Sequence, residues 1–296
     1  MAQINIMALR HSAFYAPLLM TVKGGYLQKV GLQPNYSVAT PDNPIDRNLR
    51  AGNVHCAQSA PAVSFAALEA GDDIDIVHFA SINRRDGFYL TAREPMDDFK
   101  WADLEGQDVL VDHLFQPHAT LRYAMHLNGA DFDRMNIIDA GNVEQMDGAF
   151  RGGQGAFVHQ QGPAPQQLEK DGAGYRVASI GEAIGPIAFS SLCAMRDWLE
   201  SDMAKNFLHA YQLAMNDVIE MDASDIARII HPMLPNIDRD VLETTLNDYK
   251  KLDTWNSDIS INSESYENLL KVFLHSGYIS KAHPMASCVV TPNYSA

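Results

Sequence analysis

Short apolar stretches alternate with amphipathic segments through roughly the first two hundred residues. In the first part, strand length and apolar content mark residues 4–9, 35–39, 54–58, 74–80 and 88–90. Helical spacing of apolar residues marks residues 14–30, a short segment around Ile45 and Leu49, and residues 62–70. This alternation is typical of a parallel sheet with crossover helices, so it predicts an α/β fold.

A polar segment broken by proline, residues 93–98, has the composition of a linker. A second α/β set follows, with strands expected at 109–112, 136–139, 156–159, 175–180 and 187–194 and helices at 119–127 and 143–150. After Arg196 only helical patterns occur, at 197–221, 224–231, 238–249 and 263–275. The pattern predicts two α/β lobes joined by linkers and a helical C-terminal tail, an organisation shared by hinged binding proteins and many α/β enzymes.

The composition argues against some classes of binding partner. The net charge is -15 and no Lys/Arg-rich run occurs, which argues against nucleic acid and against anionic membrane surfaces. No stretch is long and apolar enough for insertion into a membrane. The three cysteines, Cys56, Cys193 and Cys288, are widely spaced, so we expect buried thiols and no disulfide framework.

The first residues show no basic segment followed by an apolar region and a cleavage site, because residues 4–9 already have the pattern of a strand. As written, the chain is expected in the cytoplasm. Removal of a leader and its replacement by Met1 would instead make the protein periplasmic.

Four segments carry a family resemblance. They are residues 14–19 (FYAPLL) with 23–32 (KGGYLQKVGL), residues 49–60 (LRAGNVHCAQSA), residues 102–111 (ADLEGQDVLV), and the tail segments 223–227 and 261–265. In this order the chain resembles the sulfonate, nitrate and taurine substrate-binding proteins of ABC transporters, a superfamily that includes the thiamine pyrimidine synthases. The resemblance implies a type 2 periplasmic-binding-protein-like fold. Lobe 1 would comprise residues 1–92 and 190–296, with the C-terminal helices packed mainly on it, and lobe 2 residues 93–189.

The resemblance also implies a cleft in which a small-molecule ligand is bound, with a transporter permease as partner. In lobe 1, the loop after the first strand offers His11, Ser12 and Tyr15, and the loop after the third strand offers Gln58 and Ser59. The two serines have helix capping as an alternative role. Arg85 could bind a carboxylate or sulfonate, although a surface ion pair of Arg84 or Arg85 with Asp86 is the ordinary explanation. Ser190, in the strand expected to return to lobe 1, completes this side.

In lobe 2, the loop and helix start after residue 112 offer His113, Phe115, Gln116 and His118, and the strand ending near residue 159 offers His159 and Gln160. We expect these side chains to hydrogen-bond or stack on an organic ligand. A metal site would use imidazole ligands. His113 and His118 are five residues apart across a proline, however, and not at the spacing of helical metal pairs, so no metal or other cofactor is predicted.

An enzyme of the same fold is the alternative. The resemblance to thiamine pyrimidine synthases would place their cofactor-bearing lysine at Ser59, their consumed histidine at Val63 and their cysteine-rich run near residues 187–193, where only Cys193 is a cysteine. The chain also resembles the aromatic sulfinate desulfinases, and this resemblance would place their cysteine nucleophile at Ser12. We therefore predict no catalytic residue. The favoured function is binding of a small polar organic molecule, a sulfonate, a carboxylate or a pyrimidine or other ring compound, and an enzyme acting on a small ring compound is second.

Overall fold

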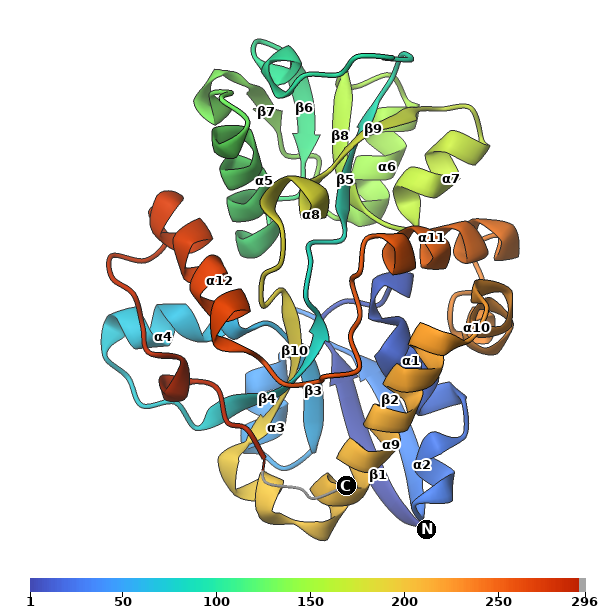
Figure 1. The fold of residues 1–296 in the computed structure, drawn as a ribbon, viewed down its shortest axis with the longest axis vertical. Helices are drawn as coiled ribbons and strands as arrows, with labels where there is room; N and C mark the ends of the chain where they lie inside the picture. The colour runs from blue at the N-terminus through green and yellow to red at the C-terminus, as the bar shows by residue number, and fades with distance from the viewer. Residues whose placement is uncertain (293–296) are drawn as a thin grey trace.

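The computed structural model describes residues 1–292 and shows two lobes, each built on one sheet (Figure 1). The N-terminus and the last described segment lie on the lobe that carries β1 to β4 and β10, where Val289 bridges to His78 of β4, and the other lobe carries β5 to β9 (Figure 1). The predicted combination of two α/β lobes with C-terminal helices is confirmed.

The first sheet has the strand order β2-β1-β3-β10-β4 in the described residues. Its strands are β1 (Ala2–Ala8), β2 (Leu32–Val38), β3 (Cys56–Ser59), β4 (Ile76–Asn83) and β10 (Ser190–Met195). β1 runs parallel to β2 and β3, whereas β10 runs antiparallel to β3 and β4. Ile4 and Ile6 on one face of β1 are fully buried in the main core, and Met7 on the other face is buried in a second cluster, so both faces of this strand are covered.

The second sheet repeats this plan with the order β7-β6-β8-β5-β9 in the part of the chain described. Its strands are β5 (Phe88–Ala92), β6 (Asp108–Val111), β7 (Asn136–Ile138), β8 (Phe157–Gln161) and β9 (Tyr175–Ser179). β6 is parallel to β7 and β8, and β5 is antiparallel to β8 and β9. Each sheet, as far as the chain is described, thus contains one antiparallel strand, β5 or β10, which directly follows a crossing between the lobes.

Within residues 1–292, two crossings connect the lobes: residues 84–87 between β4 and β5, and residues 185–189 between α8 and β10. The first crossing lies earlier than we expected, because residues 88–92, assigned to lobe 1 from the sequence, pair with β8 and β9 of the second sheet. The physical reason is that the polar segment 93–98 is a loop within lobe 2 and not the linker. The expected surface ion pair at this crossing was also wrong: Asp86 is fully buried, and Arg84 pairs with Asp253.

The helices of the described chain cover both sheets. Those of the two lobes are α1 (Ala16–Lys23), α2 (Tyr26–Lys29), α3 (Ile45–Arg50), α4 (Phe65–Ala70), α5 (Phe115–Leu127), α6 (Val143–Arg151), α7 (Ala164–Lys170) and α8 (Ile180–Ile184). The C-terminal helices are α9 (Asp202–Glu220), α10 (Ala223–Ile230), α11 (Arg239–Lys251) and α12 (Ser263–His275). α9 and α10 pack on α1, whereas α11 contacts α7 and α12 contacts α5, so the C-terminal helices also brace lobe 2.

Several helices differ from their predicted bounds, and those expected over residues 62–70 and 197–221 each begin with a 3-10 turn. The helix expected over residues 14–30 is a 3-10 turn followed by α1 and α2, because Gly25 takes a left-handed conformation (φ 84°) that ends one helix and begins the next. α5 begins at Phe115 and not at residue 119, so part of the expected loop is helical. Pro117 is accommodated because the first-turn N–H groups of a helix have no intrahelical acceptor.

Candidate functional site

A cavity of about 210 Å³ lies between the lobes, where β1, β3 and β6 end. In α/β sheets the carboxyl ends of strands are the usual place for ligands. Its lining residues are Leu9, Arg10, Tyr15, Gln58, Ser59, Ala60, Ala62, Val63, Phe88, Leu114, Phe115, Gln116, Pro117, Gln161, Phe189 and Ser190. Both lobes therefore supply its walls.

Aromatic rings form a large part of these walls. Tyr15 and the three phenylalanines Phe88, Phe115 and Phe189 line the cavity. Burial raises the pKa of Tyr15, so its hydroxyl stays protonated at neutral pH and can donate or accept a hydrogen bond. Flat apolar walls of this kind favour a ring-shaped ligand.

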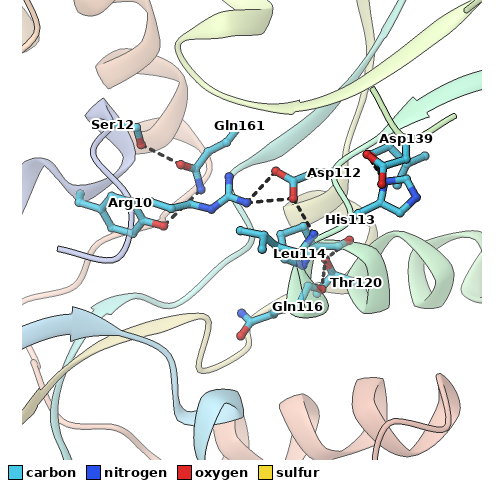
Figure 2. A network of polar contacts seen from close by, with 12 residues as sticks. Arg10, Ser12, Asp112, His113, Leu114, Gln116, Thr120, Asp139 and Gln161 are labelled. Atoms are coloured by element: carbon cyan, nitrogen blue, oxygen red, sulfur yellow. Dashed lines mark hydrogen bonds and ion pairs between the residues drawn. The ribbon is translucent and has the colours of Figure 1, made fainter. Parts of the chain in front are cut away.

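Arg10 reaches across the cleft from the end of β1 to Asp112 at the end of β6 (Figure 2). Its Nη2 lies 2.9 Å from Oδ1 and 2.7 Å from Oδ2 of that carboxylate. The side chains are 16% and 6% exposed, so solvent screens this ion pair little. The Leu114 backbone N–H also donates to Asp112, at 3.0 Å, which holds the carboxylate in place.

A second contact between the lobes runs beside the first. Ser12 donates from Oγ to Oε1 of Gln161 at 2.8 Å, and Gln161 donates from Nε2 to the Tyr15 hydroxyl at 3.4 Å (Figure 2). Ser12 also caps the 3-10 turn by accepting from the Phe14 N–H. Together with the Arg10–Asp112 pair, these contacts join the two lobes beside the cavity.

Two of the glutamines that line the cavity differ in which side-chain atoms have a hydrogen-bond partner. Gln58 accepts through Oε1 from the backbone N–H groups of Leu9 and Arg10, both at 3.0 Å. Gln116 donates from Nε2 to the Phe189 carbonyl at 2.8 Å, which leaves its Oε1 buried without a partner. Since a buried acceptor without a partner is costly, this oxygen is a candidate contact for a bound molecule.

Part of the predicted site lines this cavity. The residues are Tyr15, Gln58, Ser59, Phe115, Gln116 and Ser190, and Ser12 lies one hydrogen bond away through Gln161. Ser190 donates to Oδ1 of Asn83, which anchors the start of β10.

The predicted histidines lie elsewhere. The ring nitrogens of His11 contact the Tyr36 hydroxyl at 2.8 Å and the Met233 carbonyl at 2.7 Å. His113 contacts the Val111 carbonyl and His118 the Tyr278 hydroxyl. His159 is fully buried behind Phe88, with ring centroids 4.7 Å apart.

Gln160 and Arg85 are also outside the lining. Gln160 is fully buried with both amide atoms unpartnered, and Arg85 donates from Nη1 to the Gly181 carbonyl at 3.1 Å. Within residues 1–292, no three His, Cys, Asp or Glu side chains stand close enough together to hold a metal ion.

Sequence reasoning missed Arg10, Asp112, Phe88, Gln161 and Phe189. Arg10, Asp112 and Gln161 lie at or just after the carboxyl ends of β1, β6 and β8, so the rule that identified their neighbours could have found them. Phe88 and Phe189 lie at the amino ends of the antiparallel strands β5 and β10, to which that rule does not apply. The sequence did not show in which direction each of these side chains points. Alternation along a strand gives this direction only when the exact residue at which the strand ends is known.

A second cavity, of about 90 Å³, lies by the loop 254–262 behind the crossings and is lined by Ser81, Arg84, Ala188, Thr254 and Asn262 among others. It is much smaller and one lobe supplies nearly all its walls. The described residues contain no helix with the length and apolar character needed to cross a bilayer.

The sequence is similar to that of a known protein family and to that of one protein that its name describes as a binding protein. The sequence model of the NMT1/THI5-like family matches residues 13–223. YtlA of Bacillus subtilis (strain 168), to which its name assigns only a binding role, is 27% identical over 291 residues, which are 96% of this chain and 86% of that protein.

Solved structures give the fold. The alkanesulfonate-binding protein SsuA from Xanthomonas axonopodis pv. citri, bound to MOPS, has a TM-score of 0.76 at 15% identity and covers 98% of this chain and 99% of its own. The periplasmic nitrate-binding protein NrtA from Synechocystis PCC 6803 has a TM-score of 0.68 at 15% identity, over 96% of this chain and 83% of its own. The expected periplasmic-binding-protein-like fold is confirmed.

Proposed function

The chain belongs to the NMT1/THI5-like family, and we propose that it is the solute-binding component of an ABC-type importer that closes around one small, polar organic molecule. The observation that carries this function is the cavity between the lobes, which both lobes line and beside which an ion pair and a hydrogen bond join them. The sulfonate- and nitrate-binding relatives of the same fold support it.

The cavity sets the size of the solute. An apolar cavity of about 150 Å³ holds a benzene molecule, and this one measures about 210 Å³. One ring with short substituents therefore fills it. The aromatic walls suit the faces of such a ring, and Gln116 offers a hydrogen-bond acceptor at its edge.

The geometry gives the enzyme alternative little support. A serine nucleophile needs a base within hydrogen-bond reach of its hydroxyl, but Ser12 donates to Gln161 and both ring nitrogens of its neighbour His11 contact other groups. Ser59 and Val63 line the cavity where the thiamine pyrimidine synthases would have their lysine and histidine. Neither replacement can perform the chemistry of the original residue.

This function implies that the protein binds a transporter permease. It also implies that the protein is located on the outer side of the cytoplasmic membrane, as the periplasmic relatives are. A fold of two lobes with two crossings suits that role, because a permease can distinguish the closed, loaded form from the open one.

A ligand screen tests the proposal. The protein is heated with single-ring amides, acids, sulfonates and pyrimidines, and each stabilising compound is recovered and weighed by mass spectrometry. We expect at least one compound to raise the melting temperature by mass action and to be recovered unchanged. A compound returned with altered mass would favour the enzyme alternative.

The variant Val63→Trp locates the binding. Val63 lines the cavity yet is 55% exposed, so the indole can block the site without disturbing the core. Stabilisation by the compound should disappear in this variant and persist in the matched control Val38→Trp, which places the same ring on an exposed position of β2. Equal stabilisation of both variants would place the ligand outside the cleft.

A further inference from the structure

Among the described residues that line the cavity, only Arg10 has a charged side chain. Its positive charge is already balanced by the carboxylate of Asp112. Asp112 accepts two hydrogen bonds from it across the cleft and is itself held by the Leu114 N–H. The Arg10 guanidinium also lies over the ring of Phe88, 5.6 Å from its centroid. This arrangement gives the guanidinium a protein carboxylate in the place where an anionic ligand would have to bind.

Further backbone donors near the cavity are also occupied. The N–H groups of Leu9 and Arg10, which end β1, both point to Oε1 of Gln58. The Phe14 N–H, at the start of the next turn, points to Oγ of Ser12. An anion at the end of β1 would find these donors satisfied by the protein.

The buried polar atom of the cavity lining that lacks a hydrogen-bond partner is an acceptor. Among the buried side-chain nitrogen and oxygen atoms without a partner in residues 1–292, the one that belongs to a cavity-lining residue is Oε1 of Gln116. Its orientation is determined by the Nε2 group, which donates to the Phe189 carbonyl. Carboxylates and sulfonates offer only acceptors, so they cannot satisfy this oxygen, whereas an amide, an amine or a ring N–H can.

We infer that the cleft selects a ring compound that carries no net negative charge and presents an N–H or O–H donor to Gln116, and that Asp112 determines this selectivity by neutralising Arg10. The inference rests on the proposed function and narrows it to one of the solute classes that the sequence left open. An acidic solute would have to displace Asp112 from Arg10 and leave a buried carboxylate without its counter-charge.

The test compares benzamide, benzoate and benzenesulfonate, which share one ring and differ in charge and donors. Binding is measured by isothermal titration at neutral pH to the wild type, to Asp112→Asn and to Asp139→Asn. Asp139 is an exposed carboxylate of the same lobe outside the cavity lining, so its variant controls for the change in net charge.

In the wild type and in D139N, benzamide should bind more tightly than either anion. In D112N, Arg10 is released, and affinity for the two anions should rise by about tenfold or more, the step expected from one charge-assisted hydrogen bond. Unchanged anion affinity in D112N would overturn the inference. So would tighter binding of benzoate or benzenesulfonate than of benzamide by the wild type, a comparison that holds even where D112N does not fold.

The two proposals fail differently. Tight anion binding by the wild type, blocked by Val63→Trp, would leave the solute-binding function standing and remove only the selectivity assigned to Asp112. Absence of binding by every compound of the broader screen to the wild type would contradict the solute-binding function, while a gain of anion binding in D112N alone would still support the role of Asp112.

Discussion

The imidazole of His159 stacks on the ring of Phe88, with the ring planes inclined by 28°, and neither of its nitrogens has a hydrogen-bond partner. Burial lowers the pKa of His159 to about 3, so the ring is neutral at physiological pH. A neutral imidazole without partners loses its hydrogen bonds to water on folding and gains none. We therefore expect His159→Phe to raise the free energy of unfolding by about 1 kcal/mol, measured by urea denaturation.

His78 provides the matched comparison. It is equally buried, but its ring nitrogens contact the hydroxyls of Ser64 at 3.1 Å and Ser191 at 2.8 Å. His78→Phe leaves both hydroxyls without a partner and should lower the free energy of unfolding by about 1–3 kcal/mol. A loss of stability in His159→Phe as large as in His78→Phe would show that the His159 nitrogens are hydrogen-bonded after all.

The carboxyl of Asp86 should make stability depend on pH. It is buried in the first crossing, its Oδ1 accepts from the Phe88 N–H at 2.7 Å, and its Oδ2 has no partner. Burial raises its pKa to about 7, against about 3.9 in an unfolded chain. Between these values the folded state holds a proton that the unfolded state releases, so rising pH destabilises the fold by up to about 1.4 kcal/mol per pH unit until about pH 7.

Asp86→Asn keeps an oxygen for the Phe88 N–H and removes this titration. Its stability advantage over the wild type should grow from about pH 4.5 to about pH 7 and then level off, in urea titrations at several pH values. Asp139→Asn, at an exposed carboxyl, should follow the wild type across the same range. A constant difference between Asp86→Asn and the wild type would mean that Asp86 is ionised throughout.

Gly87 in the same crossing leaves room for the ring of Phe14. A Cβ atom at residue 87 would overlap that ring, which is fully buried and packed against Tyr249 and Phe189. Because the ring has no free space to move into, Gly87→Ala should cost about 2–3 kcal/mol of stability. Gly148→Ala is the control: a Cβ there meets nothing within 4 Å in the middle of α6, so it should stabilise by about 0.5–1 kcal/mol. Thermal unfolding separates the two, and equal stability would contradict the steric argument.

The fold was largely predictable because its strands are apolar and its helices amphipathic. The order of strands and helices from residue 4 to 83 follows directly from these periods. The sequence failed where a segment changes lobe: β5 is fully buried and looks like any strand of lobe 1, and only its pairing with β8 shows its place. Local periodicity contains no information on which distant strand will be the partner.

The candidate site was predictable at the level of loops and not of side chains. Gln58 and Gln116 follow from the rule that ligands lie at strand ends, and both line the cavity. The histidines were predicted as site residues because imidazole can hydrogen-bond to a ligand. In the structure, the ring nitrogens of His11 and His118 contact other elements of the protein. The ion pair of Arg10 and Asp112 joins residues separated by 102 positions, and no spacing in the sequence predicts this contact.

The attachment of lobe 2 to the C-terminal helices gives a last prediction. Arg176 of β9 lies between Glu169, at 2.5 Å, and Asp248 of α11, and its guanidinium lies over the ring of Tyr89. Both partners of the Arg176–Asp248 pair are about four-fifths buried, so Asp248→Asn should lower the free energy of unfolding by about 1–3 kcal/mol. Asp46→Asn is the control, because Asp46 pairs with Arg50 on the surface and Arg50 retains Asp75, and it should cost less than about 0.5 kcal/mol. Urea denaturation measures both variants, and a small, equal loss would mean that α11 contributes little to holding lobe 2.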